Sequence, residues 1–290
     1  MSRIVVLVEN TASGQGFVAE HGLAFWLEHN GHRILFDTGQ GCALQNNARL
    51  LDIGLETADA IVLSHGHYDH TGGLADALDV ANPPAVFLHP AALAPKYTKR
   101  ADGSARYIGI PNLDEAALRE KTQLVWTKAP TEVSPGIHIT GPVPRQTDFE
   151  DVGGSFFADS ECREPDTMPD DQALYLDTAE GTTVILGCAH AGVINTLRYV
   201  QQLTQNRPVH TVIGGTHLVS ASPERMDKTV EELTGLGIQR LMPCHCTGFP
   251  AMARLWHEFP QEYVPCTVGT TINLDMHPAE STAQNTEQQQ

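Results

Sequence analysis

Short apolar runs rich in Val, Ile, Leu and Phe recur along the chain and predict buried β-strands. In the first half, the predicted strands are Ile4–Val8, Leu23–Leu27, Arg33–Phe36, Ala60–Leu63, Ala85–Leu88, Leu124–Trp126 and Ile137–Thr140. Asn30-Gly31 separates the second strand from the third and is a strong hairpin signal. Helical spacing of apolar residues follows in 43–51 and 74–78.

From Gln172 onward, predicted strands and helices alternate regularly. The strands are Ala173–Leu176, Thr183–Leu186, Thr211–Ile213 and Ile238–Met242, and the helices are Ile194–Leu203, Ser222–Leu236 and Ala251–Phe259. Pro223 at the first helical position and Gly237 near the end delimit the middle helix. The two halves of the chain therefore predict two similar α/β units, each a sheet backed by helices.

Two segments lack such a pattern. Residues 141–171 are rich in Gly, Pro and acidic residues, and a stretch of this length is typical of a lid or active-site loop. Residues 277–290 are polar and low in complexity, which predicts a disordered tail. We therefore expect one domain over residues 1–276.

The chain carries 18 Lys and Arg against 35 Asp and Glu among 290 residues, a formal net charge of −17. Nucleic-acid backbones and anionic membranes call for clustered basic residues, so neither is an expected partner. The sequence has no export signal and no apolar run of about 18 residues, which predicts a cytoplasmic protein with six reduced cysteines. A homo-oligomer is possible. Histidine is unusually frequent for a chain of this length, with 14 residues.

Three histidines and an aspartate fall within six residues, directly after the predicted strand Ala60–Leu63. Side chains two apart in an extended segment point the same way, so His65 and His67 can bind one ion. Asp69 and His70 follow where the chain turns and can face a second ion. Imidazole and carboxylate suit Zn²⁺, Fe or Mn²⁺ better than Ca²⁺. The alternative is a solvated His-rich loop.

Three further histidines stand at the C-terminal ends of predicted strands: His190, His217 and His245. The C-terminal ends of strands are where α/β proteins build their sites. Any one of these residues alone is more simply a core or rim histidine. All three in register with the first motif favour metal ligands.

The segment His65-x-His67-x-Asp69-His70, preceded by Asp37-Thr38-Gly39, resembles the metallo-β-lactamase superfamily. Asp170-Asp171-Gln172-Ala173-Leu174 together with the GCAHAG, GGTHL and HCTG motifs is similar to one branch of metal-dependent hydrolases. That branch includes the archaeal dihydropterin–ribofuranosylaminobenzene phosphate synthase family. The similarity runs from about Val6 to Gly269.

The resemblance implies a four-layer αβ/βα sandwich of two mixed sheets flanked by helices, with the site at one edge between the sheets. It implies two divalent ions, zinc first, with iron, manganese or a single ion as alternatives. His65, His67 and His190 would hold one ion, and Asp69, His70 and His245 the other. Asp37 would orient a ligating imidazole. Typical members carry a bridging Asp near the place of His217, so His217 is either a ligand or a substrate contact.

Several weaker candidates remain. Because neighbours of an inward ligand on a strand point away, Cys188, Cys244 and Cys246 are interpreted as buried inert thiols. Asp171 is a candidate near the presumed lid, and His89 is a candidate for the pocket wall. The basic cluster of Lys96, Lys99, Arg100 and Arg106 is either a solvated face or a contact for a substrate phosphate or carboxylate.

We therefore expect a metal-dependent hydrolase that uses a metal-activated water on a small ester, lactone, thioester or phosphodiester. Asp69 would bind metal and accept a hydrogen bond from the water, and His217 would donate to an oxyanion or leaving group. One alternative is a pterin-linked synthase acting on a ribosyl-phosphate aminobenzene substrate. Another, from a different class, is a non-catalytic sensor of a small ligand.

Overall fold

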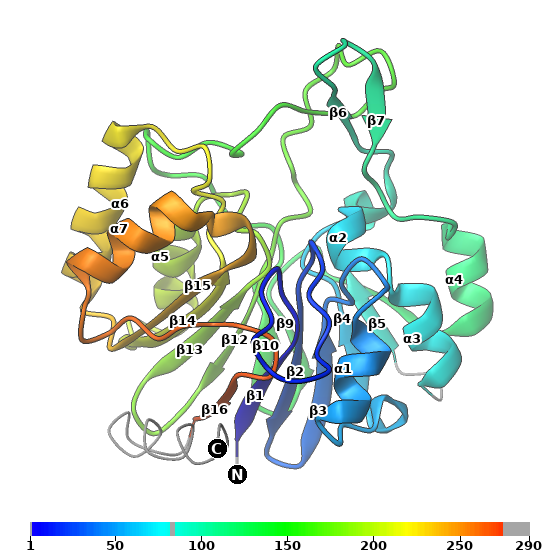
Figure 1. Cartoon of the computed structure of the whole chain (residues 1–290), viewed down its shortest axis with the longest axis horizontal. Helices are drawn as coiled ribbons and strands as arrows, with labels where there is room; N and C mark the ends of the chain where they lie inside the picture. The colour runs from blue at the N-terminus through cyan, green and yellow to red at the C-terminus, as the bar shows by residue number, and fades with distance from the viewer. Residues whose placement is uncertain (1, 82–84, 275–290) are drawn as a thin grey trace.

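Two mixed β-sheets lie face to face at the centre of the molecule (Figure 1). The structure is a computed structural model and describes residues 2–81 and 85–274. In spatial order the seven-stranded sheet contains β16 (Thr271–Asn273), β1 (Arg3–Val8), β2 (Ala24–His29), β3 (His32–Phe36), β4 (Ala60–Val62), β5 (Ala85–Leu88) and β8 (Leu124–Trp126). Strands β3, β4, β5 and β8 are parallel. Asn30 and Gly31 have φ angles of 52° and 83°, as a tight hairpin turn requires, and confirm the predicted hairpin.

The second sheet has six strands. In order they are β15 (Arg240–Cys244), β14 (Val209–Gly215), β13 (Thr182–Leu186), β12 (Ala173–Asp177), β10 (Ile137–Ile139) and β9 (Thr131–Ser134). Strands β13, β14 and β15 are parallel, so their C-terminal ends emerge at the same edge.

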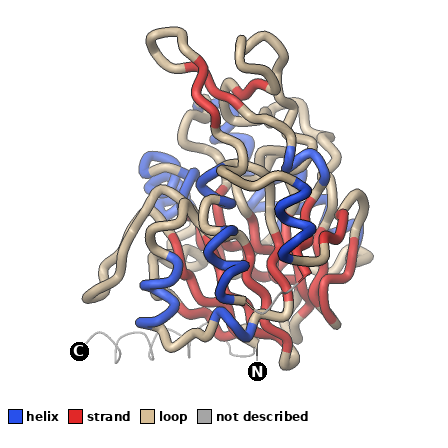
Figure 2. Tube along the Cα trace, turned by 90° about the vertical axis from the view of Figure 1, so that its right-hand side faces the viewer, coloured by secondary structure: helices blue, strands red, loops and turns tan. Residues whose placement is uncertain are grey.

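Helices cover the outer face of each sheet (Figures 1 and 2). The first sheet is accompanied by α1 (Leu44–Leu50), α2 (Tyr68–Thr71), α3 (Leu74–Val80) and α4 (Glu115–Lys121), and the second by α5 (Val193–Leu203), α6 (Pro223–Leu236) and α7 (Phe249–Glu258). Single turns of 3-10 helix are η1 (Leu55–Thr57), η2 (Pro90–Leu93) and η3 (His245–Thr247).

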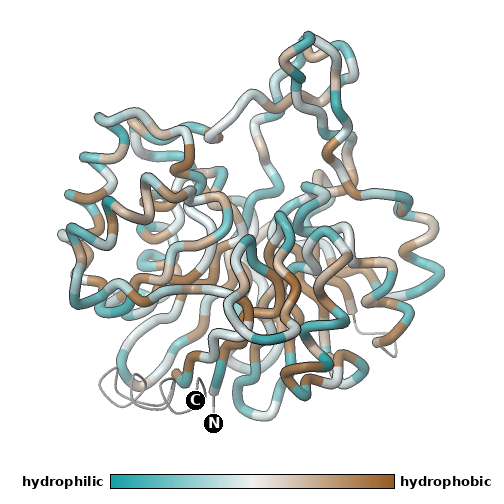
Figure 3. Tube along the Cα trace, in the orientation of Figure 1, coloured by the Kyte–Doolittle hydropathy of each residue, from teal (hydrophilic) through white to brown (hydrophobic). Residues whose placement is uncertain are grey.

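Three hydrophobic clusters separate four layers, two of helices and two of β-sheet. Along β2, Phe25 faces a cluster between the two sheets, whereas Trp26 faces the helices α1, α3 and α4. A third cluster joins Val184 of β13 to Leu197 of α5. Figure 3 shows hydrophobic residues concentrated along the central strands. The predicted αβ/βα sandwich is confirmed.

A small third sheet rises above one edge of the sandwich (Figure 1). It consists of β6 (Tyr97–Lys99), β7 (Ala105–Tyr107) and β11 (Phe156–Phe157), in the order β11-β6-β7. The sequence did not predict these strands, nor β9, α4 and β16, because segments this short carry little periodicity. The segment 141–171, expected to lack regular structure, contributes β11 and pairs with β6.

Two further expectations concern the ends and the membrane. The predicted tail, residues 277–290, lies outside the described residues. Within the described part of the chain, no helix combines the length and apolar character that crossing a membrane requires.

Candidate metal centre

The loops that leave both sheets converge at one edge of the sandwich. Asp37 follows β3 and the His65–His70 motif follows β4, whereas His190, His217 and His245 follow β13, β14 and β15. Several of these loop residues adopt positive φ angles that side chains rarely take: Asp37 (59°), Ala189 (53°), His217 (47°) and His245 (52°). Strain of this kind costs of order 1–3 kcal/mol per residue and is typical of functional sites.

His65, His67 and His190 form the imidazole trio. Their candidate ligand atoms lie within 4.8 Å of one another, and His65 Nε2 is 3.0 Å from His67 Nδ1. All three rings are buried. Burial lowers the pKa of each ring, that of His67 to about 4. Uncharged rings therefore present lone pairs rather than protons to the site.

Asp69, His70 and His245 form the carboxylate trio. His245 Nε2 lies 3.4 Å from Asp69 Oδ2 and 3.2 Å from His70 Nε2. Burial would raise the pKa of Asp69, but hydrogen bonds from His21 and His245 hold it well below the usual value. Burial also opposes charge on His70, yet the Asp37 carboxylate and then Asp69 raise its pKa to about 9. The carboxylates thus favour positive charge at this place.

Four histidines of the two trios are tethered through their outer nitrogens. For His65, His70, His190 and His245, the Nδ1 partners are Ser64 Oγ (2.9 Å), Asp37 Oδ2 (2.7 Å), Val152 O (2.8 Å) and Asn10 Oδ1 (2.9 Å). Ser64 Oγ itself donates to Asp37 Oδ2, so it accepts from His65. A metal ion that displaces any proton from Nε2 would leave each ring donating from Nδ1 with its Nε2 lone pair facing inward, as in metal-ligating histidines.

The unpartnered atoms test whether a cation fits. Among the described residues, the buried side-chain atoms without a hydrogen-bond partner include His67 Nε2, His190 Nε2 and His217 Nδ1. A buried polar atom left unpaired costs about 1–3 kcal/mol. Two of these atoms belong to the imidazole trio, and the third belongs to His217, whose ring lies beside that of His190. Imidazole with carboxylate is a donor set that suits zinc and similar divalent ions. The residues fit a metal centre.

The structure brings two of the remaining candidates to the centre. Asp37 accepts hydrogen bonds from Ser64 N at 2.7 Å and from Ser64 Oγ at 2.7 Å, and it also holds His70. The half-buried His217 ring lies 4.3 Å from that of His190, centroid to centroid.

Asp171 and His89 have other surroundings. Asp171 is buried, with Oδ2 accepting from Ala191 N at 2.7 Å and Oδ1 unpartnered, and burial raises its pKa to about 7. His89 caps η2 by accepting from Ala91 N at 3.2 Å. It is not among the described residues that line the cavity of the centre.

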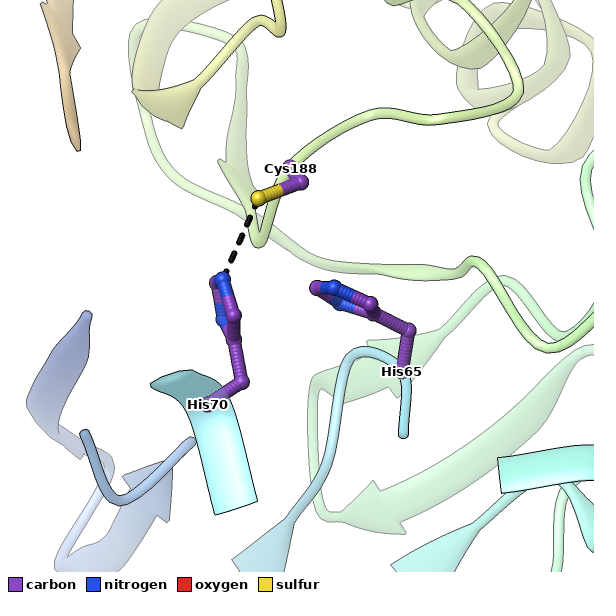
Figure 4. A group of neighbouring side chains, drawn as sticks. All are labelled: His65, His70 and Cys188. Carbon is purple, nitrogen blue, oxygen red and sulfur yellow. Dashed lines mark hydrogen bonds between the residues drawn. The ribbon is translucent and has the colours of Figure 1, made fainter. Parts of the chain in front are cut away.

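Two residues of the centre were missed or misinterpreted from the sequence. Cys188 Sγ lies 3.1 Å from His70 Nε2 (Figure 4). The alternation argument failed because Cys188 lies beyond the end of β13 at Leu186, where side chains no longer alternate. His21 Nε2 lies 3.2 Å from Asp69 Oδ2, and no motif in the sequence marks it.

The basic cluster does not form one surface. Lys96 is only 1% exposed and donates to Asp166 Oδ2 and Asp170 Oδ1, each at 2.9 Å. The interpretation of a solvated face is therefore wrong for Lys96, although Lys99 and Arg100 are exposed. Nothing in the sequence links Lys96 to acids some 70 positions later. Asp170 Oδ2 accepts from the Gly66 amide at 2.8 Å, so this buried ion pair reaches the backbone between His65 and His67.

A cavity of about 380 Å³ opens over both trios. Its apolar wall includes Ile108, Phe156 and Val219, and Arg106 stands on its rim over the Tyr68 ring at 4.9 Å. Phe156 comes from β11 and packs 4.9 Å from His67, ring to ring. The segment predicted as a lid thus supplies part of the wall; its movement remains a prediction.

Comparisons with known proteins agree with this fold. Residues 18–217 match the family model of the metallo-beta-lactamase superfamily. An uncharacterized protein of Methanocaldococcus jannaschii is 36% identical over 87% of this chain and 93% of its own length. From the same organism, 7,8-dihydropterin-6-methyl-4-(beta-D-ribofuranosyl)-aminobenzene-5'-phosphate synthase is 29% identical over 94% of this chain and 96% of its own. The crystal structure of a metal-dependent hydrolase of the beta-lactamase superfamily superposes with a TM-score of 0.81 and 31% identity, covering 95% of this chain and all of that one.

Proposed function

The chain belongs to the metallo-beta-lactamase superfamily, and from this premise we propose that it is a metal-dependent hydrolase of a small ester, lactone, thioester or phosphodiester. The observation that carries the proposal is the set of four histidines tethered at Nδ1 with Nε2 facing inward. The imidazole trio would hold one divalent ion and the carboxylate trio a second, with zinc the favoured metal. When bound, such cations supply Lewis acidity that makes water a stronger acid and polarises a carbonyl or phosphoryl oxygen.

The side chains around the cavity have separate roles in this proposal. Asp69 is ionised and lies at the cavity, where its carboxylate can accept a hydrogen bond from the attacking water and orient it. His217 also lines the cavity and can donate to the oxygen of the leaving group or of the oxyanion. Phe156 and Val219 cover the centre with apolar surface, which excludes bulk water and strengthens these interactions.

The cavity and the charge favour a small substrate. A volume of about 380 Å³ suits a small molecule rather than a polymer, and the net charge of −17 disfavours nucleic acid. We propose cytoplasmic residence because all six cysteines are free thiols.

A second candidate function is a pterin-linked synthase. It is favoured by the archaeal relative of that name, which matches 94% of this chain at 29% identity. Arg106 on the cavity rim offers a cation for an anionic group such as a phosphate. The third alternative, a non-catalytic sensor, predicts lost ligands; the six donors lie together in the two trios, which supports an enzyme.

Metal quantification coupled to a substrate panel tests the proposal. We expect purified protein to contain a divalent transition metal and to turn over at least one of a set of lactones, thioesters and phosphodiesters. His190→Ala should lower both metal content and turnover, whereas His257→Ala, at an exposed position of α7, should change neither. Metal content and turnover that survive in His190→Ala would contradict the proposal.

A further inference from the structure

The thiol of Cys188 occupies the middle of the metal centre. Five groups of potential ligand atoms occur among the described residues, and in each group the atoms lie within 4.8 Å of one another. Cys188 belongs to three of the five: one with His65 and His70, one with His190 and His217, and one with His245 and Cys246. Its sulfur is therefore close to members of both the imidazole trio and the carboxylate trio.

The local backbone directs this thiol inward. Cys188 follows the end of β13, and in Figure 4 its Sγ is directed at the His70 ring, 3.1 Å from His70 Nε2. Gly187 permits the approach, because a Cβ at that position would come within 2.1 Å of Ser64 Oγ and 3.4 Å of Asp37 Oδ2. Any larger residue would push the loop away from the support of His65 and His70.

The small number of negative charges near the two trios suggests a role for the Cys188 thiol. Asp69 is the one carboxylate in the five donor groups of the described residues, and it occurs only in the group with His21 and His245. Two divalent ions beside the trios would thus face a single carboxylate and several neutral rings. A thiolate supplies a second negative charge between the trios, and thiolates bind Zn²⁺ well.

Other cysteines in the chain show what an inert thiol looks like. Cys244 and Cys266 lie in the apolar cluster between the sheets and in none of the donor groups. Cys246 belongs to one group, with Cys188 and His245. The buried nitrogen His190 Nε2 has no hydrogen-bond partner, and the His190 ligand atom shares a donor group with Cys188. This orphan atom points to a ligand in the space that Cys188 faces.

We propose that Cys188 is a direct thiolate ligand of the bound metal, placed between the imidazole trio and the carboxylate trio. The inference rests on the metal centre of the proposed function and adds a sulfur donor to it. On coordination the S–H bond is broken, the proton leaves to solvent, and no electron is transferred.

X-ray absorption of the zinc-loaded full-length protein tests the proposal directly. A sulfur ligand lies at about 2.3 Å from zinc and nitrogen or oxygen ligands at about 2.0–2.2 Å, so the two shells are distinguishable. We expect a sulfur shell in the wild-type protein, its loss in Cys188→Ala, and its retention in the matched control Cys266→Ala. Loss of an outer-sphere partner typically weakens metal affinity 10–100-fold, so we expect loss of this direct donor to weaken zinc binding by more than about 100-fold.

The other outcomes are equally decisive. A wild-type zinc spectrum without sulfur overturns the proposal, and it does so even if the Cys188 variants fail to fold. A sulfur shell that persists in Cys188→Ala but disappears in Cys246→Ala also overturns it. In either case, bound zinc and turnover would leave the proposed hydrolase intact, whereas a protein that binds no metal would fail the proposed function itself.

Discussion

The two halves of the centre hold their ligands by different means. The imidazole trio consists of neutral, buried rings whose pKa is lowered by burial. Its outer contacts include main-chain groups: Val152 O holds His190, and the Gly66 amide is held by Asp170. The carboxylate trio instead contains one acid and has a second, Asp37, directly behind His70.

The two trios therefore attract a cation in different ways. Three neutral imidazoles attract a cation only through correctly aimed lone pairs, so the imidazole trio depends on the backbone that aims them. The carboxylate trio attracts a cation by net negative charge as well, and a buried charge is felt strongly at short range. Substitutions at each support should therefore affect one half of the centre before the other.

The largest effect should come from removing a ligand of either trio. Asp69→Asn keeps the size of the side chain but removes the charge that binds metal and the acceptor proposed to orient water. We expect kcat/KM to fall by about 10⁴-fold, with metal lost first from the carboxylate trio. His65→Ala should cause a comparable loss but deplete the imidazole trio first. Elemental analysis and steady-state kinetics on both variants provide the measurement.

The control is His138→Ala; His138 lies on β10, stacks on Tyr175 and belongs to none of the donor groups of the described residues. Equal metal content in Asp69→Asn, His65→Ala and the control would remove the basis for treating the trios as separate cation sites.

The sequence pattern predicted those residues of the centre that lie just beyond the ends of apolar strands. His65, His190 and His245 each lie shortly after the end of an apolar strand, so their meeting at one edge could be expected. Lys96, His21 and Cys188 could not be placed in this way. Lys96 pairs with acids about 70 positions away, and Cys188 lies just past a strand where no periodicity applies. Likewise, β6, β7 and β11 are too short to show a period, although Phe156 of β11 shapes the cavity.

Lys96 tests the backbone support of the imidazole trio. Lys96→Met leaves Asp166 and Asp170 buried without their cation, and breaking one side of a buried ion pair costs about 3–5 kcal/mol. We expect a loss of that size in the free energy of unfolding of the metal-free protein, measured in urea. Lys99→Met, at a nearby exposed position on β6, should change stability by less than about 0.5 kcal/mol.

Zinc titration of Lys96→Met compares the zinc affinities of the two trios. If Gly66 is aimed through Asp170, zinc affinity should fall at the imidazole trio while the carboxylate trio keeps its own. Uniform weakening at both trios would argue for a general loss of packing instead.

Asp37 tests the charge support of the carboxylate trio. Asp37→Asn removes the negative charge behind His70 and weakens the acceptor that holds its Nδ1, at 2.7 Å in the wild-type protein. Loss of such a partner typically lowers metal affinity 10–100-fold, and we expect this at the carboxylate trio. Because Asp37 also accepts from Ser64, which holds His65, a smaller loss should appear at the imidazole trio. Competition with a chromophoric chelator would resolve the two affinities.

Substitution of His21 should give the smallest effect. It tests a contact that the carboxylate trio makes at its solvent-exposed side. The His21 ring lies 3.2 Å from Asp69 Oδ2, but its side chain is 57% exposed, so water screens the interaction. An exposed pair of this kind contributes about 0.2–1 kcal/mol, and His21→Ala should therefore change kcat/KM by no more than about fivefold. A loss approaching that of Asp69→Asn would show that His21 does more than form an exposed ion pair with Asp69, and would contradict this ranking.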